Sequence, residues 1–342
     1  MRKKLTCTVL ALMMVGSLAA CGGGDTGTNT SGGNGGDGAT YTFKLAHHLN
    51  EEHIGSQFPL DFAEQVKTDS NGAITVDVYG NSQLGTQAEN AEAIRMGTLD
   101  FCINDFPTMA TVYPKADVVA LPYIFEDFDH VNAFFESDEM AAMIDDMAKT
   151  TGVRIIGPSY DGFRDVFTQT PVKSVADMQG LQIRVPDIPI YVSCFKALGC
   201  STTIVSFSEL YTALQTGVVT GLENAASSVY TSALYEQTKY IADTHHIFCD
   251  TSLMANENVL NSLSDDLRQV VLDAGYDAAV AHRQRAEEAQ GEYISMLEEK
   301  GMESISVNRE EFRDACSSTW DDYKQNVEGG AELIDYILSL AD

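Results

Sequence analysis

One long helical pattern, residues 265–300, limits the folds open to this chain of 342 residues. Apolar residues from Leu267 to Leu297 recur there at helical spacing, Ser264 is a suitable N-cap, and Gly301 follows the last turn. At 1.5 Å per residue, a helix of this length is about 50 Å long. Because that exceeds the diameter of a small domain, we expect the helix to cross two domains.

Strand-like and helix-like segments alternate before that helix. Short apolar–polar alternations predict strands, and apolar residues three and four positions apart predict helices. The expected strands are residues 41–45, 74–78, 99–103, 117–121 and 153–157, and the expected helices are residues 54–68, 87–96 and 207–216. This rhythm predicts an α/β protein with mainly parallel sheets.

Residues 180–186 place an arginine on a further expected strand. Leu181, Ile183 and Val185 face one side of that strand, and Arg184 faces the other. The head of Arg184 is therefore expected to face a cleft or water. A guanidinium on a rigid strand end matches a carboxylate with two parallel hydrogen bonds, so the pattern indicates a small organic anion as ligand.

Residues 1–20 have the composition of an export signal. Three basic residues precede the apolar residues 5–20, a stretch shorter than the roughly 20 residues of a membrane span. The stretch ends in Leu-Ala-Ala before Cys21, which resembles a bacterial lipobox, so we expect a lipoprotein signal peptide and a lipid on Cys21. An ordinary signal peptide and a single transmembrane anchor are the alternatives. Residues 21–39 are rich in Gly, Thr, Asn and Ser and predict a flexible tether.

The composition argues against nucleic acid as a partner. The chain has 21 Lys and Arg residues against 50 Asp and Glu residues, a formal net charge of −29, which leaves no basic patch for phosphates. An anionic solute has to be held by local arginines against this overall charge. Beyond Cys21 the chain has Cys102, Cys194, Cys200, Cys249 and Cys316. We interpret these mainly as small buried hydrophobic residues, and the sequence leaves one disulfide open.

A series of motifs along the chain carries a family resemblance. Residues 173–224 resemble the signature region of the solute-binding subunits of TRAP (tripartite ATP-independent periplasmic) transporters. Further matching pieces are Phe43-Lys-Leu-Ala-His47, Ser70-Asn-Gly72, Gln83-Leu-Gly85, Gly97-Thr-Leu-Asp100, Ala120-Leu-Pro-Tyr123 and Gly162-Phe-Arg164. The resemblance implies a two-lobed, periplasmic-binding-protein-like fold with a long helix crossing both lobes. We expect lobe I to comprise residues 40–161 and 250–289, and lobe II residues 162–249 and 290–342.

The resemblance also implies a function and a set of binding residues. Such receptors capture carboxylate-bearing solutes outside the cell and deliver them to small and large membrane subunits. On lobe II, Arg184 matches the family's carboxylate-binding arginine, Arg164 a second arginine, Asn224 a carboxylate-binding asparagine and Phe207 an aromatic residue against the ligand body. Asp187 stands where the family often has Glu or Asn. On lobe I, the matching positions that face the cleft are His47, Gln87, Asn104 and Asp105.

Asp105 bears on the choice of solute. An acid in a carboxylate-binding cleft indicates that the far end of the ligand presents hydrogen-bond donors, which favours a sugar acid over a C4-dicarboxylate.

Two other classes of protein compete with this interpretation. Ser206, Ser208 and the histidines invite an extracellular hydrolase, but no Gly-x-Ser-x-Gly or aligned nucleophile and base occurs. A metal-binding surface lipoprotein would use His47, His48 and His53, but these lack the spacing of known metal motifs. We therefore expect a cleft with no catalytic residue, no metal and no cofactor.

Overall fold

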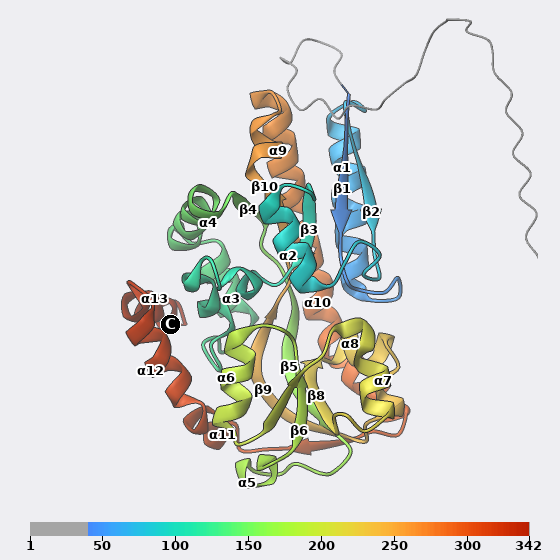
Figure 1. Cartoon of the computed structure of the whole chain (residues 1–342), viewed down its shortest axis with the longest axis vertical. Helices are drawn as coiled ribbons and strands as arrows, with labels where there is room; N and C mark the ends of the chain where they lie inside the picture. The colour runs from blue at the N-terminus through green and yellow to red at the C-terminus, as the bar shows by residue number, and fades with distance from the viewer. Residues whose placement is uncertain (1–39, 342) are drawn as a thin grey trace, which may run out of the picture. The chain divides into compact units, whose positions relative to one another are not determined.

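The computed structural model describes residues 40–341, which belong to one compact unit of the chain (Figure 1). The predicted signal peptide, the lipidated Cys21 and the tether at residues 21–39 lie outside the described residues. No helix within the described range is long and apolar enough to cross a membrane.

The first sheet has five strands in the order β2-β1-β3-β10-β4. Its central strands β1 and β3 are parallel to each other, and β1 is also parallel to β2. Strand β10 runs antiparallel to both of its neighbours. The bounds are β1 (Tyr41–Ala46), β2 (Ile74–Tyr79), β3 (Phe101–Asn104), β4 (Val153–Gly157) and β10 (Ser252–Asn256).

The second sheet has six strands in the order β11-β9-β5-β8-β6-β7. Strand β6 is parallel to β7 and β8, and β9 is parallel to β11, whereas β5 is antiparallel to β8 and β9. The bounds are β5 (Tyr160–Thr168), β6 (Gln182–Val185), β7 (Ser201–Ile204), β8 (Gly221–Ala225), β9 (Tyr240–Asp250) and β11 (Glu303–Ser306).

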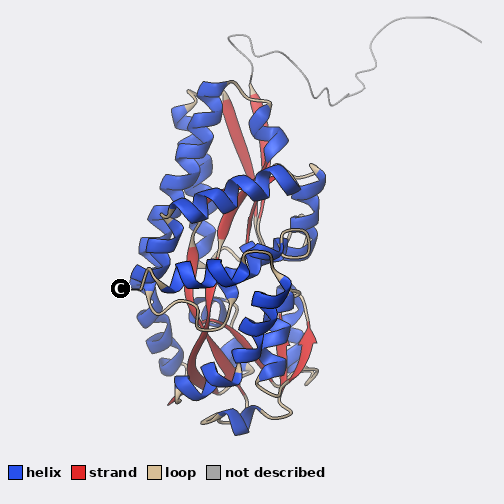
Figure 2. Cartoon of the chain, turned by 90° about the vertical axis from the view of Figure 1, so that its left-hand side faces the viewer, coloured by secondary structure: helices blue, strands red, loops and turns tan. Residues whose placement is uncertain are grey.

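Helices lie on both sides of these strands (Figure 2). The α-helices are α1 (Gln57–Asp69), α2 (Gln87–Met96), α3 (Phe128–Phe135), α4 (Asp138–Thr151), α5 (Val175–Met178), α6 (Pro189–Ala197), α7 (Leu210–Gln215), α8 (Ala226–Thr231), α9 (Glu257–Asn261), α10 (Asp265–Glu299), α11 (Arg309–Ala315), α12 (Ser317–Asn326) and α13 (Gly330–Leu338). The short 3₁₀ helices are η1 (Ile54–Ser56), η2 (Phe106–Met109), η3 (Pro114–Ala120), η4 (Phe207–Glu209) and η5 (Leu234–Glu236).

Most of the predicted elements are confirmed, and local chemistry explains their ends. Helix α2 begins at a capping box, in which the Thr86 hydroxyl accepts from the backbone of Glu89 and the Glu89 carboxylate accepts from the backbone of Thr86. It ends at Gly97, which has φ 72°, a left-handed conformation that glycine adopts without strain. Helix α10 begins at Ser264, whose side chain accepts from the amide of Leu267.

The predicted strand at residues 117–121 is wrong. The segment from Pro114 to Ala120 forms η3, and the amide of Leu121 closes it by donating to the carbonyl of Val118. Val118 and Val119 are fully buried, so the apolar run reflects packing in the core. Proline fixes the backbone at the start of this short helix and offers no amide for a strand ladder.

The two sheets are mixed, and the parallel pairings are only a narrow majority among the described strands. The antiparallel pairings arise where the chain passes between the sheets without a crossover helix. Strand β4 leads almost directly into β5, and β9 into β10, so two extended segments run side by side between the sheets, with Tyr160 opposite Asp250 (Figure 1).

Helix α10 belongs to the cores of both sheets, which confirms the expected long helix across two lobes. Val271 and Ala278 lie in the apolar core that also contains α1 and the first sheet. Leu297 lies in the apolar core of the second sheet with Phe167 and Leu222. The two-lobed α/β architecture predicted from the sequence is therefore present.

Candidate functional site

A cavity of about 150 Å³ lies between residues of the second sheet and residues of the loops and helices that adjoin the first sheet, and it continues into a smaller one of about 20 Å³. The two share His48, Gln87, Arg184, Pro186 and Phe207, and we call them together the cleft. The larger part is also lined by hydroxyl-bearing residues, namely Ser82, Thr86, Thr108 and Ser206. The smaller part adds Asp105, Asp161, Arg164, Asn224, Ser228, Cys249 and Thr251.

Arg184 lines both parts of the cleft and is 2 % exposed. Arg184 lies on strand β6, between β7 and β8. The residues on either side of Arg184 in the sequence, Ile183 and Val185, are fully buried. Its Nε donates to the carbonyl of Val205 at 2.8 Å, and its two terminal nitrogens have no hydrogen-bond partner among residues 40–341. Burial lowers the pKa of Arg184 to about 10, so the guanidinium stays charged at neutral pH. The cleft therefore contains a buried cation with unused donors.

Arg164 is held differently, by a carboxylate of the protein itself. From β5, its Nε donates to Oε2 of Glu223 at 2.6 Å, and its Nη2 donates to Oε1 at 2.8 Å. Its Nη1 also donates to Sγ of Cys249 at 3.1 Å, and the guanidinium lies 4.9 Å from the centre of the Tyr191 ring. Burial opposes the charge of Glu223, but Arg164 holds the pKa of that carboxyl below its usual value. Most of the donor capacity of Arg164 is thus already used.

Three more predicted residues of the second lobe line the cleft. Asn224 lies on β8 and lines the smaller part, and its Oδ1 accepts from the amide of Ala225 at 2.8 Å. Phe207 lines both parts and meets His48 edge-on, with ring centres 5.6 Å apart. Asp187 lines the larger part, directly after the end of β6.

On the first lobe, Gln87 and Asp105 line the cleft and are hydrogen-bonded to each other. Nε2 of Gln87 donates to Oδ1 of Asp105 at 3.2 Å. Asn104 lines neither part, but its side chain accepts from the amide of Asp105 and donates to the carbonyl of Gln87. It therefore fixes the backbone of both residues. Burial raises the pKa of Asp105 to about 7.

His48 lines the cleft where the sequence predicted His47. The ring of His47 instead lies against Gly80, where an added Cβ would come within 2.8 Å of it. Both follow the end of β1, where neighbouring side chains point to opposite sides. Burial lowers the pKa of His47 to about 4 and that of His48 to about 3, so both rings are neutral at pH 7.

Sequence reasoning missed several residues of the cleft wall, namely Asp161, Ser228, Cys249 and Thr251, and also Glu223, which lies behind the wall and holds Arg164. Glu223 could have been found from the sequence, because it lies within residues 173–224, which carried the family resemblance, and Asp161 directly precedes the matching piece Gly162-Phe-Arg164. Asp161 accepts from Thr251 at 3.0 Å and pairs with His282 of α10 at 3.1 Å.

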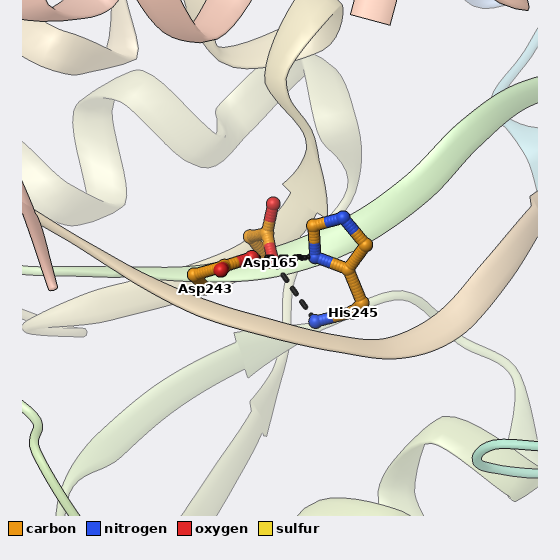
Figure 3. A group of neighbouring side chains, drawn as sticks. All are labelled: Asp165, Asp243 and His245. Atoms are coloured by element: carbon orange, nitrogen blue, oxygen red, sulfur yellow. Dashed lines mark hydrogen bonds and ion pairs between the residues drawn. The ribbon is translucent and has the colours of Figure 1, made fainter. Parts of the chain in front are cut away.

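A possible metal-ligand group lies away from the cleft wall, at Asp165, Asp243 and His245 (Figure 3). Arg309 already occupies this group, because its Nη2 contacts the carboxylate of Asp243 and lies 2.9 Å from Nδ1 of His245. Burial opposes protonation of His245, but hydrogen bonds to the two aspartates raise its pKa to about 9. His245 and Arg309 are thus both cationic at neutral pH and balance the carboxylates of Asp165 and Asp243. A positively charged metal ion is disfavoured at such a group.

Two lobes joined by crossing strands around a cleft with a buried cation define a class of protein, the two-lobed solute-binding receptors. Residues 45–326 match the family model described as bacterial extracellular solute-binding protein, family 7. The sialic acid-binding periplasmic protein SiaP of Vibrio cholerae is 32 % identical over 289 residues, which cover 84 % of this chain and 90 % of that protein.

Solved structures agree with this match. A TRAP periplasmic solute-binding protein from Bordetella bronchispeptica is 28 % identical with a TM-score of 0.82, and covers 89 % of this chain and 99 % of its own. One from Roseobacter denitrificans, with bound L-galactonate, is 29 % identical with a TM-score of 0.81 and the same coverage. The chain belongs to extracellular solute-binding protein family 7. It is an extracytoplasmic receptor of the TRAP type and not an enzyme.

Proposed function

We propose that this receptor captures a sugar acid, with the carboxylate of the solute on Arg184. The observation that carries the proposal is the nearly buried guanidinium of Arg184, whose terminal nitrogens have no partner among the described residues and which lines the cleft. A solute carboxylate supplies the missing counter-charge and accepts two parallel hydrogen bonds. Asn224 and Phe207 line the same smaller part of the cleft as Arg184, so we assign them contacts with the same end of the solute.

The rest of the cleft suits hydroxyl groups. Ser82, Thr86, Thr108 and Ser206 offer hydroxyls that donate or accept, and the Gln87–Asp105 pair offers an amide beside a carboxyl. We assign Gln87, Asp105 and His48 to the recognition of solute hydroxyls, and we assign His47 and Asn104 to shaping the wall behind them. Arg164 makes a smaller contribution to solute binding than Arg184, because its donors are already paired with Glu223.

Relatives of this chain support an acid with several hydroxyls. The Roseobacter denitrificans protein holds L-galactonate, and a relative from Escherichia coli that is 25 % identical is named as a 2,3-diketo-L-gulonate-binding periplasmic protein. Each of these molecules has one carboxylate on a hydroxylated carbon chain. A C4-dicarboxylate has a second carboxylate, and Asp105, which lines the smaller part of the cleft together with Arg184, disfavours that second negative charge when it is ionised.

We propose that two lobes of the chain close over the solute. Lobe I comprises residues 40–161 and 250–289, and lobe II comprises residues 162–249 and 290–342. All strands of the first sheet fall in the former set. Two of the borders fall where β5 begins and where β9 ends, which is where extended chain passes between the sheets, and the third falls within α10. The closed receptor then delivers its solute to the small and large TRAP membrane subunits.

We also propose that a lipid on Cys21 anchors the receptor to the membrane. We expect the wild type to incorporate a labelled fatty acid and the Cys21→Ser variant not to incorporate it. Equal labelling of both would rule the anchor out.

Thermal unfolding and calorimetry with a panel of compounds test the solute class. The panel contains hexonates, hexuronates, C4-dicarboxylates and, as a matched neutral control, the alditols of the same sugars. We expect a hexonate or hexuronate to raise the unfolding temperature, and its alditol and the C4-dicarboxylates to leave it unchanged. Equal binding of an acid and its alditol would show that the carboxylate is not recognised, and tighter binding of a C4-dicarboxylate would contradict the sugar-acid proposal.

A further inference from the structure

Two cysteines far apart in the sequence have their sulfur atoms in contact. Cys194 lies on α6, and Cys316 lies at the junction of α11 and α12. Their Sγ atoms are 3.6 Å apart, although the two positions are separated by 122 in the sequence, and neither residue is exposed. Both are free thiols in this structure.

The other three described cysteines have different surroundings. Sγ of Cys200 donates to the carbonyl of Met178 at 3.4 Å. Sγ of Cys249 accepts from Arg164 at 3.1 Å. Cys102 lies on β3 in the core, with no hydrogen bond to its sulfur among the described residues. Within residues 40–341, Cys194 and Cys316 are thus the one pair of thiols in sulfur–sulfur contact.

We propose that Cys194 and Cys316 are joined by a disulfide in the exported protein. Formation of the bond shortens the separation of the two sulfurs from 3.6 Å to the roughly 2.05 Å of an S–S bond. The extracytoplasmic side of the membrane, where proteins of this family act, is oxidising compared with the cytosol.

The oxidant is a disulfide of a thiol–disulfide exchange catalyst. One cysteine thiolate attacks that disulfide and forms a mixed disulfide, releasing one catalyst thiol. The second cysteine thiolate then attacks the mixed disulfide, which forms the Cys194–Cys316 bond and releases the other catalyst thiol. The two cysteines together lose two protons and two electrons, and the catalyst gains both as its two thiols.

Burial fixes when this exchange takes place. The hydrogen bond to Cys316, together with burial, raises the pKa of the Cys194 thiol well above its usual value, which leaves little thiolate in the folded protein. The bond therefore forms while the chain is folding. Once it is buried, the same packing protects it from reductants.

The bond has a local structural effect near the cleft. Helix α6 directly follows Pro186, Asp187 and Ile188, which line the larger part of the cleft. A disulfide at Cys194 ties this helix to the C-terminal helices and so holds that wall in place.

Peptide mapping of the full chain, exported by a bacterial host and trapped in acid, tests the proposal. Free thiols are alkylated under denaturing conditions without reductant, and the digest is analysed by mass spectrometry. We expect a linked peptide containing Cys194 and Cys316, which disappears after reduction. Recovery of both cysteines as alkylated thiols in the exported protein would overturn the proposal.

Matched variants separate the bond from general packing. The exported wild type and Cys200→Ser should both lose at least about 5 °C of unfolding temperature after denaturation and refolding in reductant, because the long closed loop no longer restricts the unfolded chain. Cys194→Ser should unfold at the same temperature with and without this treatment. An unfolding temperature of the wild type that does not respond to reduction would contradict the proposal.

Discussion

Two regions of the second sheet each contain a buried arginine, but they treat its charge in opposite ways. Where β5 pairs with β8, the carboxylate of Glu223 accepts two short hydrogen bonds from Arg164. On β6, Arg184 has one bond to a backbone carbonyl, and no carboxylate within the described residues forms an ion pair with it. A buried charge without a partner costs free energy. The protein thus neutralises one arginine itself and leaves the other to be neutralised by the solute.

This difference shows how a receptor separates stability from binding. The Arg164–Glu223 pair forms when the chain folds, so its free energy contributes to the folded state whether or not solute is present. The counter-charge of Arg184 arrives with the solute, so its free energy contributes to affinity. The following four predictions test this division, from the largest expected effect to the smallest.

Removal of Glu223 should mainly reduce stability. Glu223→Ala leaves the charge of Arg164 buried without its partner, so we expect a loss of about 3–5 kcal/mol in the free energy of unfolding. Urea unfolding of the solute-free protein measures it. Glu303→Ala is the control, because Glu303 pairs with Lys239 at 3.5 Å on the surface and should change stability by less than about 1 kcal/mol. Similar losses in both variants would mean that the Glu223 pair is not structural.

Removal of Arg184 should mainly reduce affinity. Arg184→Ala loses a charge-assisted contact of about 2–5 kcal/mol, which corresponds to roughly 30-fold to several thousand-fold weaker binding of the sugar acid. Arg184→Lys keeps the charge without the planar fork and should also bind poorly. Calorimetry measures the affinity, and urea unfolding should show little loss of stability. Binding of Arg184→Ala within about threefold of the wild type would place the solute elsewhere.

Joint replacement of the neutralised pair should cost less than breaking it. Arg164→Met combined with Glu223→Met leaves no buried charge, so the double variant should be more stable than Glu223→Ala. Its affinity for the solute should fall less than that of Arg184→Ala, because Arg164 has few donors left to offer. A larger loss of affinity than in Arg184→Ala would reverse the roles of the two arginines.

Affinity should also fall as the pH rises through 7. Burial raises the pKa of Asp105 to about 7, so this carboxyl is largely neutral at pH 6 and largely ionised at pH 8. The ionised form attracts Arg184 and competes with the solute carboxylate. We expect binding to be about three- to tenfold weaker at pH 8 than at pH 6, since one unit of pKa shift corresponds to a factor of ten. Asp105→Asn should bind equally at both values, and a persistent pH dependence in that variant would exclude Asp105 as the cause.

The sequence predicted those features of the cleft that depend on local pattern. The alternation around Arg184 indicated a side chain directed away from the apolar face, and the structure places it in the cleft. The predicted N-cap Ser264 likewise marks the start of α10.

Features that depend on distant contacts were not predictable in this way. Arg164 and Glu223 are 59 residues apart and meet only through the pairing of β5 with β8. The choice between His47 and His48 depends on where the alternation of β1 ends, which a one-residue change reverses. The apolar run at residues 117–121 looked like a strand because burial in a core produces the same pattern as a sheet.

Helix α10 has a mechanical consequence for opening and closing. Near Gly275 its backbone touches that of Gly157 at the end of β4, where an added Cβ on Gly157 would come within 2.4 Å of the Gly275 carbonyl. Its later turns, at Tyr293 and Leu297, pack on the second sheet. Because the two ends are fixed to different sheets, any rotation of one lobe against the other bends the helix between them. We therefore expect α10 to resist lobe rotation, so that part of the binding free energy is used to bend this helix when the lobes close.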